Sequence, residues 1–161
     1  MPEIKGPAPA DGFVKDPRWV IFPRLSNINH RKIEERNEAL TAVLSGYARN
    51  RIYQPDGFAK GKRGIAAGGF SFTYALEART HLGTDVPLFK VSTPFPFPEE
   101  KALEFMTGLD EVLCVEELDP VIERELTYLC GKHQLKTKIF GKLTGHMPCS
   151  GEKSLVQVEE S

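Results

Sequence analysis

The stretch Val86–Cys130, VPLFKVSTPFPFPEEKALEFMTGLDEVLCVEELDPVIERELTYLC, decides the fold of this chain. It predicts a strand, a proline-rich turn, a helix, a second strand and a second helix, joined by short connections. Pro98 suits the first turn of the first helix, and Asp119 followed by Pro120 is typical of an N-cap and a first turn. The apolar centre of Glu111–Glu117 is what a strand covered on both faces requires.

The same rhythm continues on both sides of this stretch. GIAAGG from Gly64 predicts a buried strand that ends in a Gly-Gly turn, and Leu135–Phe140 predicts a fourth strand after a helix that we expect to end at Gly131. Phe70–Leu82 predicts a helix whose buried side would be Phe70, Tyr74, Ala78 and Leu82. Strands that alternate with helices, joined by right-handed crossovers, predict an α/β fold. We expect three α/β/α layers, an open, mostly parallel sheet and an N-terminal helical lead-in.

The chain divides into an arm, a lead-in, a domain and a tail. The predicted segments are a flexible arm (1–16), a helical lead-in and linker (17–62), the α/β domain (63–148) and a flexible tail (149–161). Within the lead-in, Asn29–Arg49 has the spacing of an amphipathic helix, and the polar segment 51–63 predicts a loop. The apolar segment Trp19–Phe22 has two interpretations, an edge strand and a simple anchor.

Composition and charge exclude some classes of protein. The 161 residues are 40% hydrophobic and 27% charged, which is typical of a globular domain, and the net charge of -1 gives no sign of a nucleic-acid-binding face. No apolar run approaches the roughly 20 residues of a membrane-spanning helix. The polar N-terminus lacks the apolar core of a signal peptide, so a cytoplasmic location is expected.

Neither the cysteines nor the histidines form a recognisable site. Cys114, Cys130 and Cys149 contain no CxxC pair, and the four histidines show no metal-ligand spacing. Cys114 lies within an apolar run and is expected to be a small buried hydrophobe. No serine occupies a GxSxG turn. The sequence therefore predicts no catalytic residue, no cofactor-binding residue and no metal ligand in this chain.

A site is expected where the strands end, because ligands of open α/β sheets meet the carboxyl ends of the strands. Glu116 and Glu117 are adjacent in a strand and point to opposite faces, which favours a structural or interface role over acid–base catalysis. The candidates for contact with another domain or with substrate are Gly68, Gly69, Ser92, Thr93, Glu116 and Glu117.

Two of these strand ends leave alternatives open. The Gly68-Gly69 turn precedes a helix, so its amides could receive a phosphate or carboxylate, but glycines are also the usual residues of a tight turn. Phe95 and Phe97 lie between prolines on a stiff loop. They predict either an apolar rim for a partner or side chains packed onto the sheet edge.

Several segments, in the same order and spacing, resemble one enzyme family. They are KDPRWVIFP, HRKIEERNEAL, NRIY, GIAAGGFSFTYALEA, VPLFKVSTPFPFPEEKALEFMTGLDEVLCVEELDPVIE and GKLTGHMP. Together they cover about Val14–Pro148 and resemble the alpha subunit of indolepyruvate:ferredoxin oxidoreductase, in the thiamine diphosphate-dependent 2-oxoacid:ferredoxin oxidoreductase superfamily. The matched part resembles its domain similar to the transketolase C-terminal domain, preceded by a helical lead-in.

The resemblance implies the chemistry of a larger enzyme. That enzyme converts aryl pyruvates, coenzyme A and oxidised ferredoxin to aryl-acetyl-CoA, carbon dioxide and reduced ferredoxin, with thiamine diphosphate, magnesium and iron–sulfur clusters. This sequence lacks the GDG motif and its Asn pair, and it lacks the cluster-binding cysteine motifs. No catalytic residue carries over, so we expect the chain alone to be inactive and to be an excised middle domain or a subunit of a split enzyme.

Two functions follow from these expectations. The first is a non-catalytic structural or interface domain, whose partners are the other domains of the alpha subunit and the beta subunit. In this function Gly69, Thr93 and Glu117 are the leading residues that face an active site held elsewhere. The second is an independent module that binds coenzyme A or another phosphate-bearing ligand at the Gly68-Gly69 turn.

Overall fold

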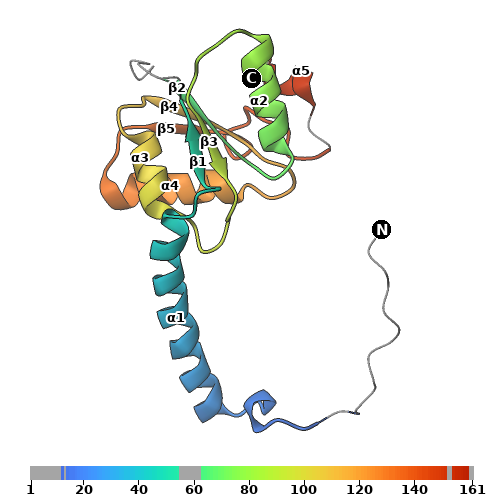
Figure 1. Cartoon of the computed structure of the whole chain (residues 1–161), viewed down its shortest axis with the longest axis vertical. Coiled ribbons are helices and arrows are strands. Elements are labelled where there is room, and N and C mark those ends of the chain that lie inside the picture. Colours follow the sequence, from blue (N-terminus) through green and yellow to red (C-terminus); the bar gives the residue numbers. More distant parts are fainter. Residues whose placement is uncertain (1–11, 13, 55–62, 152–153, 160–161) are drawn as a thin grey trace. The chain divides into compact units, whose positions relative to one another are not determined.

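The computed structural model describes residues 12, 14–54, 63–151 and 154–159, in two compact units, 1–36 and 37–161 (Figure 1). Most of the predicted arm, the end of the predicted lead-in and linker (55–62) and parts of the predicted tail lie outside the described residues. The predicted domain boundaries stay a prediction.

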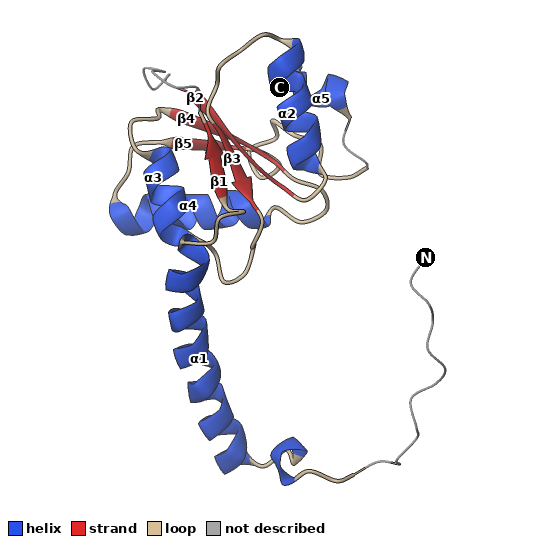
Figure 2. Ribbon diagram, viewed as in Figure 1, coloured by secondary structure: helices blue, strands red, loops and turns tan. Residues whose placement is uncertain are grey.

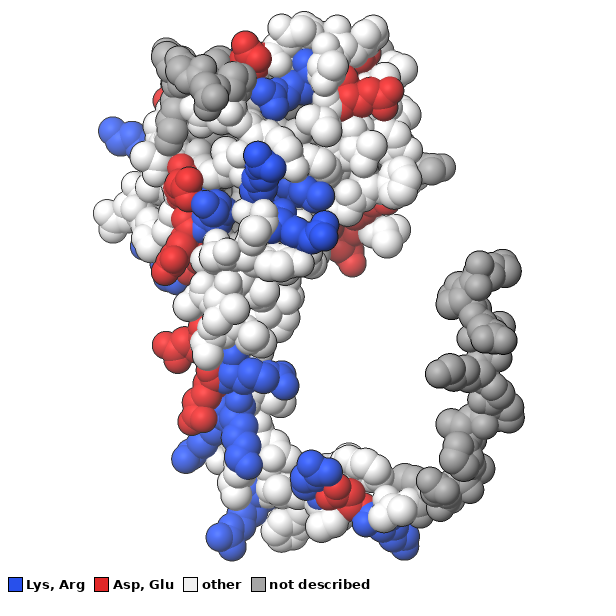
Figure 3. All heavy atoms as spheres, in the orientation of Figure 1, with Lys and Arg blue, Asp and Glu red and all other residues white. Residues whose placement is uncertain are grey.

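The first unit contains a short 3₁₀ helix and the beginning of helix α1. In the 3₁₀ helix, η1 (Pro17–Trp19), the Asp16 carboxylate accepts the Arg18 amide at 2.8 Å. Helix α1 (Pro23–Ser45) begins and ends earlier than the predicted Asn29–Arg49. The earlier start is possible because proline is tolerated in the first turn of a helix. Val20–Phe22 is exposed and forms no strand within the described part of this unit. Lys and Arg side chains gather along the first half of α1 in Figure 3.

The second unit is built on a five-stranded sheet in the order β1-β3-β2-β4-β5. The strands are β1 (Arg51–Tyr53), β2 (Arg63–Gly68), β3 (Leu88–Val91), β4 (Glu111–Val115) and β5 (Lys138–Phe140). Strands β2 to β5 are parallel to their neighbours, and β1 pairs antiparallel with β3. The mostly parallel sheet is confirmed. Strand β1 lies where a loop was predicted, because three residues are too few to show a strand period.

Helices cover both faces of this sheet, as Figure 2 shows. They are α2 (Ser71–His81), α3 (Glu99–Met106), α4 (Val121–His133) and α5 (Leu155–Glu159). One core cluster joins α3 and α4 to the sheet, and a second joins α2 and α5 to the other face. The three-layer α/β/α architecture is therefore confirmed. Helix α5 lies within the segment for which a flexible tail was predicted.

Strand β4 shows why its sequence is continuously apolar. Val112 and Cys114 belong to the cluster under α3 and α4, whereas Val115 belongs to the cluster under α2 and α5. Both faces of the strand are buried, as the apolar run predicted. Burial also raises the pKa of the Cys114 thiol well above its usual value, so this cysteine is the buried hydrophobe that was expected.

The predicted buried face of α2 was right at Ala78 and wrong at Phe70 and Leu82. Phe70 is 67% exposed, and Leu82 is also exposed, whereas the buried residues are Ser71, Phe72, Ala75 and Ala78. The Phe72 ring packs on Tyr53 of β1, with a centroid distance of 5.3 Å. The helix therefore turns toward a strand that the sequence pattern does not reveal, and this contact selects the face.

Candidate functional site at the carboxyl edge

The four parallel strands end at one edge of the sheet, which we call the carboxyl edge: the ends of β2 to β5 and the loops that begin at Gly69, Ser92, Glu116 and Gly141. Strand β2 continues into α2 on one face, and its neighbour β4 continues into α4 on the other. Such a divergence is where open α/β sheets form a crevice. Gly68 ends β2 and the other five candidate residues follow β2, β3 or β4, so the fold gathers all six at this edge.

The two glycines after β2 have different roles. A Cβ on Gly68 would lie 3.0 Å from both Ile122 Cδ1 and the Val91 carbonyl oxygen, so Gly68 permits close packing between β2, β3 and α4. Gly69 has a φ of +55°, and a Cβ there would meet nothing within 4 Å. The turn therefore needs Gly69 for its left-handed backbone, and the space beside that glycine is open.

Asn50 organises the loop after β3, although its sequence context gives no sign of this. Its Oδ1 accepts the amides of Ser92 at 2.7 Å and Thr93 at 3.2 Å, and its Nδ2 donates to Thr93 Oγ1 at 2.7 Å and to the Leu44 carbonyl at 2.8 Å. The Ser92 hydroxyl donates to the Arg49 carbonyl. Buried Asn50 thus ties the end of α1 to the loop after β3.

Glu116 supplies the N-terminal cap of α4. Its carboxylate accepts the amides of Ile122 at 2.6 Å and Glu123 at 3.0 Å, whereas the predicted cap, Asp119, makes no side-chain cap bond. Burial raises the pKa of Glu116, and the two amides act against that shift. Strand β4 ends at Val115 and not at Glu117 as predicted, so both glutamates lie in the loop after the strand, and Glu117 is exposed. The predicted N-cap of α4 was wrong, because the capping side chain is that of Glu116, which directly follows the preceding strand.

Behind this cap lies a second buried carboxylate that the sequence did not indicate. Glu123 Oε2 accepts the Leu143 amide at 3.0 Å, while its Oε1 is buried with no hydrogen-bond partner among the described residues. A Cβ on Gly141 would lie 2.6 Å from Glu123 Oε2, so only glycine leaves room for the carboxylate. Buried Lys142 donates through Nζ to the Leu118 carbonyl. The loops after β4 and β5 are thereby bonded together.

The carboxyl edge exposes large apolar side chains beside the carboxylates of Glu117 and Asp119. Each of its four loops carries a large exposed hydrophobic residue: Phe70, Phe95, Leu118 and Leu143. Phe95 fulfils the prediction of an apolar rim, whereas Phe97 is buried and fulfils the alternative of packing. The edge therefore binds Asn50, Ser92 and Glu116 within the domain and exposes an apolar residue on each of its four loops.

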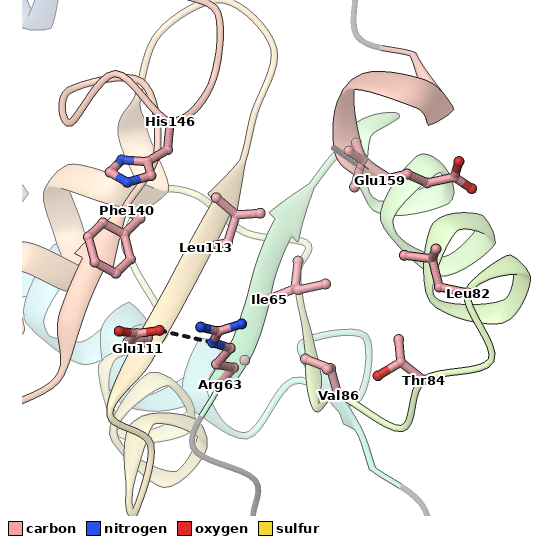
Figure 4. Close-up of a pocket in the computed structure, with 12 residues that line it drawn as sticks. Arg63, Ile65, Leu82, Thr84, Val86, Glu111, Leu113, Phe140, His146 and Glu159 are labelled. Atoms are coloured by element: carbon pink, nitrogen blue, oxygen red, sulfur yellow. Dashed lines mark hydrogen bonds and ion pairs between the residues drawn. The ribbon is translucent and has the colours of Figure 1, made fainter. Parts of the chain in front are cut away.

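A cavity of about 550 Å³ opens elsewhere, over the face of the sheet that carries α2 and α5 (Figure 4). Ile65 and Leu113 line it, and Phe140 and His146 stack beside it with a centroid distance of 4.5 Å. The ion pair between Arg63 and Glu111 also lines the cavity, at the first residues of β2 and β4. The ion pair lies at the opposite ends of the strands from the carboxyl edge, whereas Phe140 and His146 belong to that edge, and the sequence did not predict this cavity.

The described residues offer neither a metal site nor a membrane span. No group of three or more His, Cys, Asp or Glu side chains in that part of the chain is arranged to hold a metal ion. None of the helices there is long and apolar enough to cross a bilayer. Acidic and basic side chains both occur on the face of the second unit in Figure 3.

Comparison with known proteins identifies the relatives. No family model matches the chain. It is 35% identical to the indolepyruvate oxidoreductase subunit IorA of Methanothermobacter thermautotrophicus over 87% of its own length and 23% of that subunit. This chain is similar to one part of IorA. The IorA of Thermococcus kodakarensis is 38% identical over 81% of the chain and 20% of the subunit. The predicted resemblance is therefore confirmed, and the chain spans less than a quarter of these relatives.

Solved structures support the fold. The 2-oxoglutarate:ferredoxin oxidoreductase of Magnetococcus marinus, solved with 2-oxoglutarate, coenzyme A and succinyl-CoA, superposes with a TM-score of 0.50 and 19% identity. The match covers 74% of this chain and 20% of that one. A split-gene transketolase gives a TM-score of 0.47 with 17% identity, over 59% of this chain and 32% of that one. The fold of the Magnetococcus marinus structure agrees with the α/β architecture of this chain.

Proposed function

We propose that this chain is a structural and interface domain of an indolepyruvate, or aryl pyruvate, ferredoxin oxidoreductase, and that it supplies no catalytic residue. The observation that carries the proposal is its identity of 35% to IorA over 87% of the chain. In this proposal, thiamine diphosphate, magnesium, iron–sulfur clusters, coenzyme A and ferredoxin are bound by the rest of the enzyme. A cytoplasmic location stays a prediction.

The chemistry of the carboxyl edge supports an interface role. The side chains of Asn50, Ser92 and Glu116 make hydrogen bonds within the domain, so these polar groups serve to hold loops in place. Phe70, Phe95, Leu118 and Leu143 remain exposed at the same edge. Apolar side chains gathered on one edge are typical of a surface that another protein segment covers. We infer that the carboxyl edge faces another domain of the enzyme.

The test uses the complete oxidoreductase that contains this chain. We expect Thr93→Ala to lower both turnover of indolepyruvate and assembly, because Thr93 Oγ1 accepts from Asn50 and fixes the loop after β3 at the interface. Glu117→Ala is the second variant, since Glu117 is exposed at the same edge. Turnover and assembly at wild-type values in both variants would contradict an interface at this edge.

A coenzyme A module at the Gly68-Gly69 turn is the alternative, and one observation favours it. The space beside Gly69 is open, and the turn leads into the N-terminus of α2, where amide groups attract phosphate. Calorimetry of the chain with coenzyme A separates the two functions. Micromolar binding that Gly69→Ala weakens would support the module, and the absence of heat would favour the interface domain.

A further inference from the structure

The loop between β4 and α4 presents a leucine to solvent in an unusual backbone conformation. Leu118 is 85% exposed and has a φ of +53°, in the left-handed region that leucine rarely adopts. Glycine or asparagine would relieve this strain, and a polar side chain would suit the exposure. An exposed leucine in a strained conformation is therefore unfavourable twice over for the isolated domain.

The loop around this leucine is held in place by buried groups. Glu116, two residues before it, accepts the first amides of α4, and Lys142 Nζ donates to the carbonyl of Leu118 itself. Both Glu116 and Lys142 are buried, so these bonds are shielded from water. The leucine side chain is consequently displayed by a preorganised turn, and the ordering of this loop does not have to be supplied on binding.

Two carboxylates flank the leucine. Glu117 and Asp119 are exposed, and no ion pair or hydrogen bond holds either carboxylate among the described residues. The displayed group is therefore a single apolar side chain between two negative charges. Its complement is an apolar recess bordered by Lys or Arg side chains.

We propose that Leu118 is the central anchor of the carboxyl-edge interface and inserts into a basic-rimmed apolar recess on another domain or subunit of the same enzyme. This inference rests on the proposed function and adds the residue and the chemistry of the surface that receives it. Burial of the leucine in the recess offsets its strain and its exposure, which the isolated domain leaves uncompensated.

The test measures the melting temperature of the chain alone and the hydrogen-exchange protection of residues 116–121 in the enzyme. If Leu118 had only a structural role, these two quantities would not change independently of one another. Leu118→Gly removes the side chain and relieves the backbone strain, so we expect the melting temperature of the chain alone to rise by about 3 °C. In the complete oxidoreductase, amides of residues 116–121 in the wild-type chain should exchange hydrogen more slowly than in the free chain. Leu118→Gly should reduce that protection about tenfold or more.

Gln134→Gly is the matched control. Gln134 also has a φ of +53° and is exposed. It is the C-terminal cap of α4 and belongs to none of the four carboxyl-edge loops. Its replacement should raise the melting temperature of the chain by a similar amount of about 3 °C and leave protection of 116–121 unchanged. The variant Glu117→Gln with Asp119→Asn should keep the protection but lose its sensitivity to salt.

Each remaining outcome decides the proposal. Equal exchange of 116–121 in the free chain and in the enzyme, or full protection in Leu118→Gly, would overturn it while leaving the proposed function intact. Protection that appears in the free chain at high concentration would show that a second copy covers the leucine, and this also overturns it. If the chain is found in no oxidoreductase complex, the proposed function fails as well.

Discussion

The two ends of the parallel strands treat polar and apolar groups in opposite ways. At the carboxyl edge, Asn50, Glu116 and Glu123 are buried and bonded to backbone amides, and each of the four loops exposes a large apolar side chain. At the amino ends, Arg63 and Glu111 form an ion pair at the surface, and Lys138 is exposed. One end is thus built like a surface that protein covers, and the other like a surface that water covers.

The largest effect should come from Glu116→Ala. This change leaves the amides of Ile122 and Glu123 without their acceptor, and we expect the free energy of unfolding to fall by about 3 kcal/mol. Glu117→Ala is the control, because Glu117 is exposed and its loss should cost less than about 0.5 kcal/mol. Urea titration measures both. Equal losses of unfolding free energy in the two variants would show that the cap made by Glu116 does not stabilise the chain.

Two glycine substitutions compare a position at the carboxyl edge with a position inside α4. Gly141→Ala places a Cβ against the buried Glu123 carboxylate and should destabilise the chain by about 2 kcal/mol. Gly131→Ala lies inside α4 with nothing near its Cβ, so it should stabilise the chain by about 0.7 kcal/mol. Thermal unfolding of both variants gives the signs. A stabilised Gly141→Ala would mean that Glu123 moves away without cost.

Asn50 should rank close behind. Asn50→Ala removes an acceptor for two amides and a donor for two oxygens, and we expect a loss of about 2 kcal/mol in urea titration. Asn50→Asp keeps the acceptor for Ser92 and Thr93 but removes the donor to the Leu44 carbonyl. For Asn50→Asp we expect a loss of unfolding free energy smaller than that of Asn50→Ala. If Asn50→Asp is as stable as wild type, the bond to α1 contributes nothing.

At the amino ends of the strands, the loss of a charged side chain should lower the free energy of unfolding much less. Arg63→Ala removes an exposed guanidinium from Glu111, and the expected loss is about 0.5 kcal/mol, smaller still in high salt. Unfolding in urea at two salt concentrations measures it. A loss as large as that of Asn50→Ala would remove the difference between the two ends.

The smallest effect concerns pH. The Glu159 carboxylate of α5 accepts from His81 Nδ1 at 2.5 Å, and this contact raises the pKa of His81. Because the folded pKa is the higher one, the stabilisation is complete below the unfolded pKa of the imidazole and is lost as pH rises through the folded pKa. The protection factors of the α5 amides, which correct for the general rise of amide exchange with pH, should therefore fall above neutral pH. His81→Gln should show no such dependence.

The sequence predicted the architecture more fully than the details of the carboxyl edge. The apolar run of β4 and the alternation of elements are strong signals, because burial on both faces leaves no polar position in a strand. Asn50 and Glu123 could not be found this way, since each is a single polar residue whose partners are remote or lie in loops. The strain at Leu118 is equally invisible, because the sequence shows a leucine and not its φ.

The two outer strands limit how the sheet can grow. Strand β1 (Arg51–Tyr53) and strand β5 (Lys138–Phe140) each have three residues, so each border offers only a short row of unpaired backbone groups. Arg51 and Lys138 are exposed there, and a charge on a border strand discourages pairing with another chain. Aggregation by strand addition is thus disfavoured on both borders.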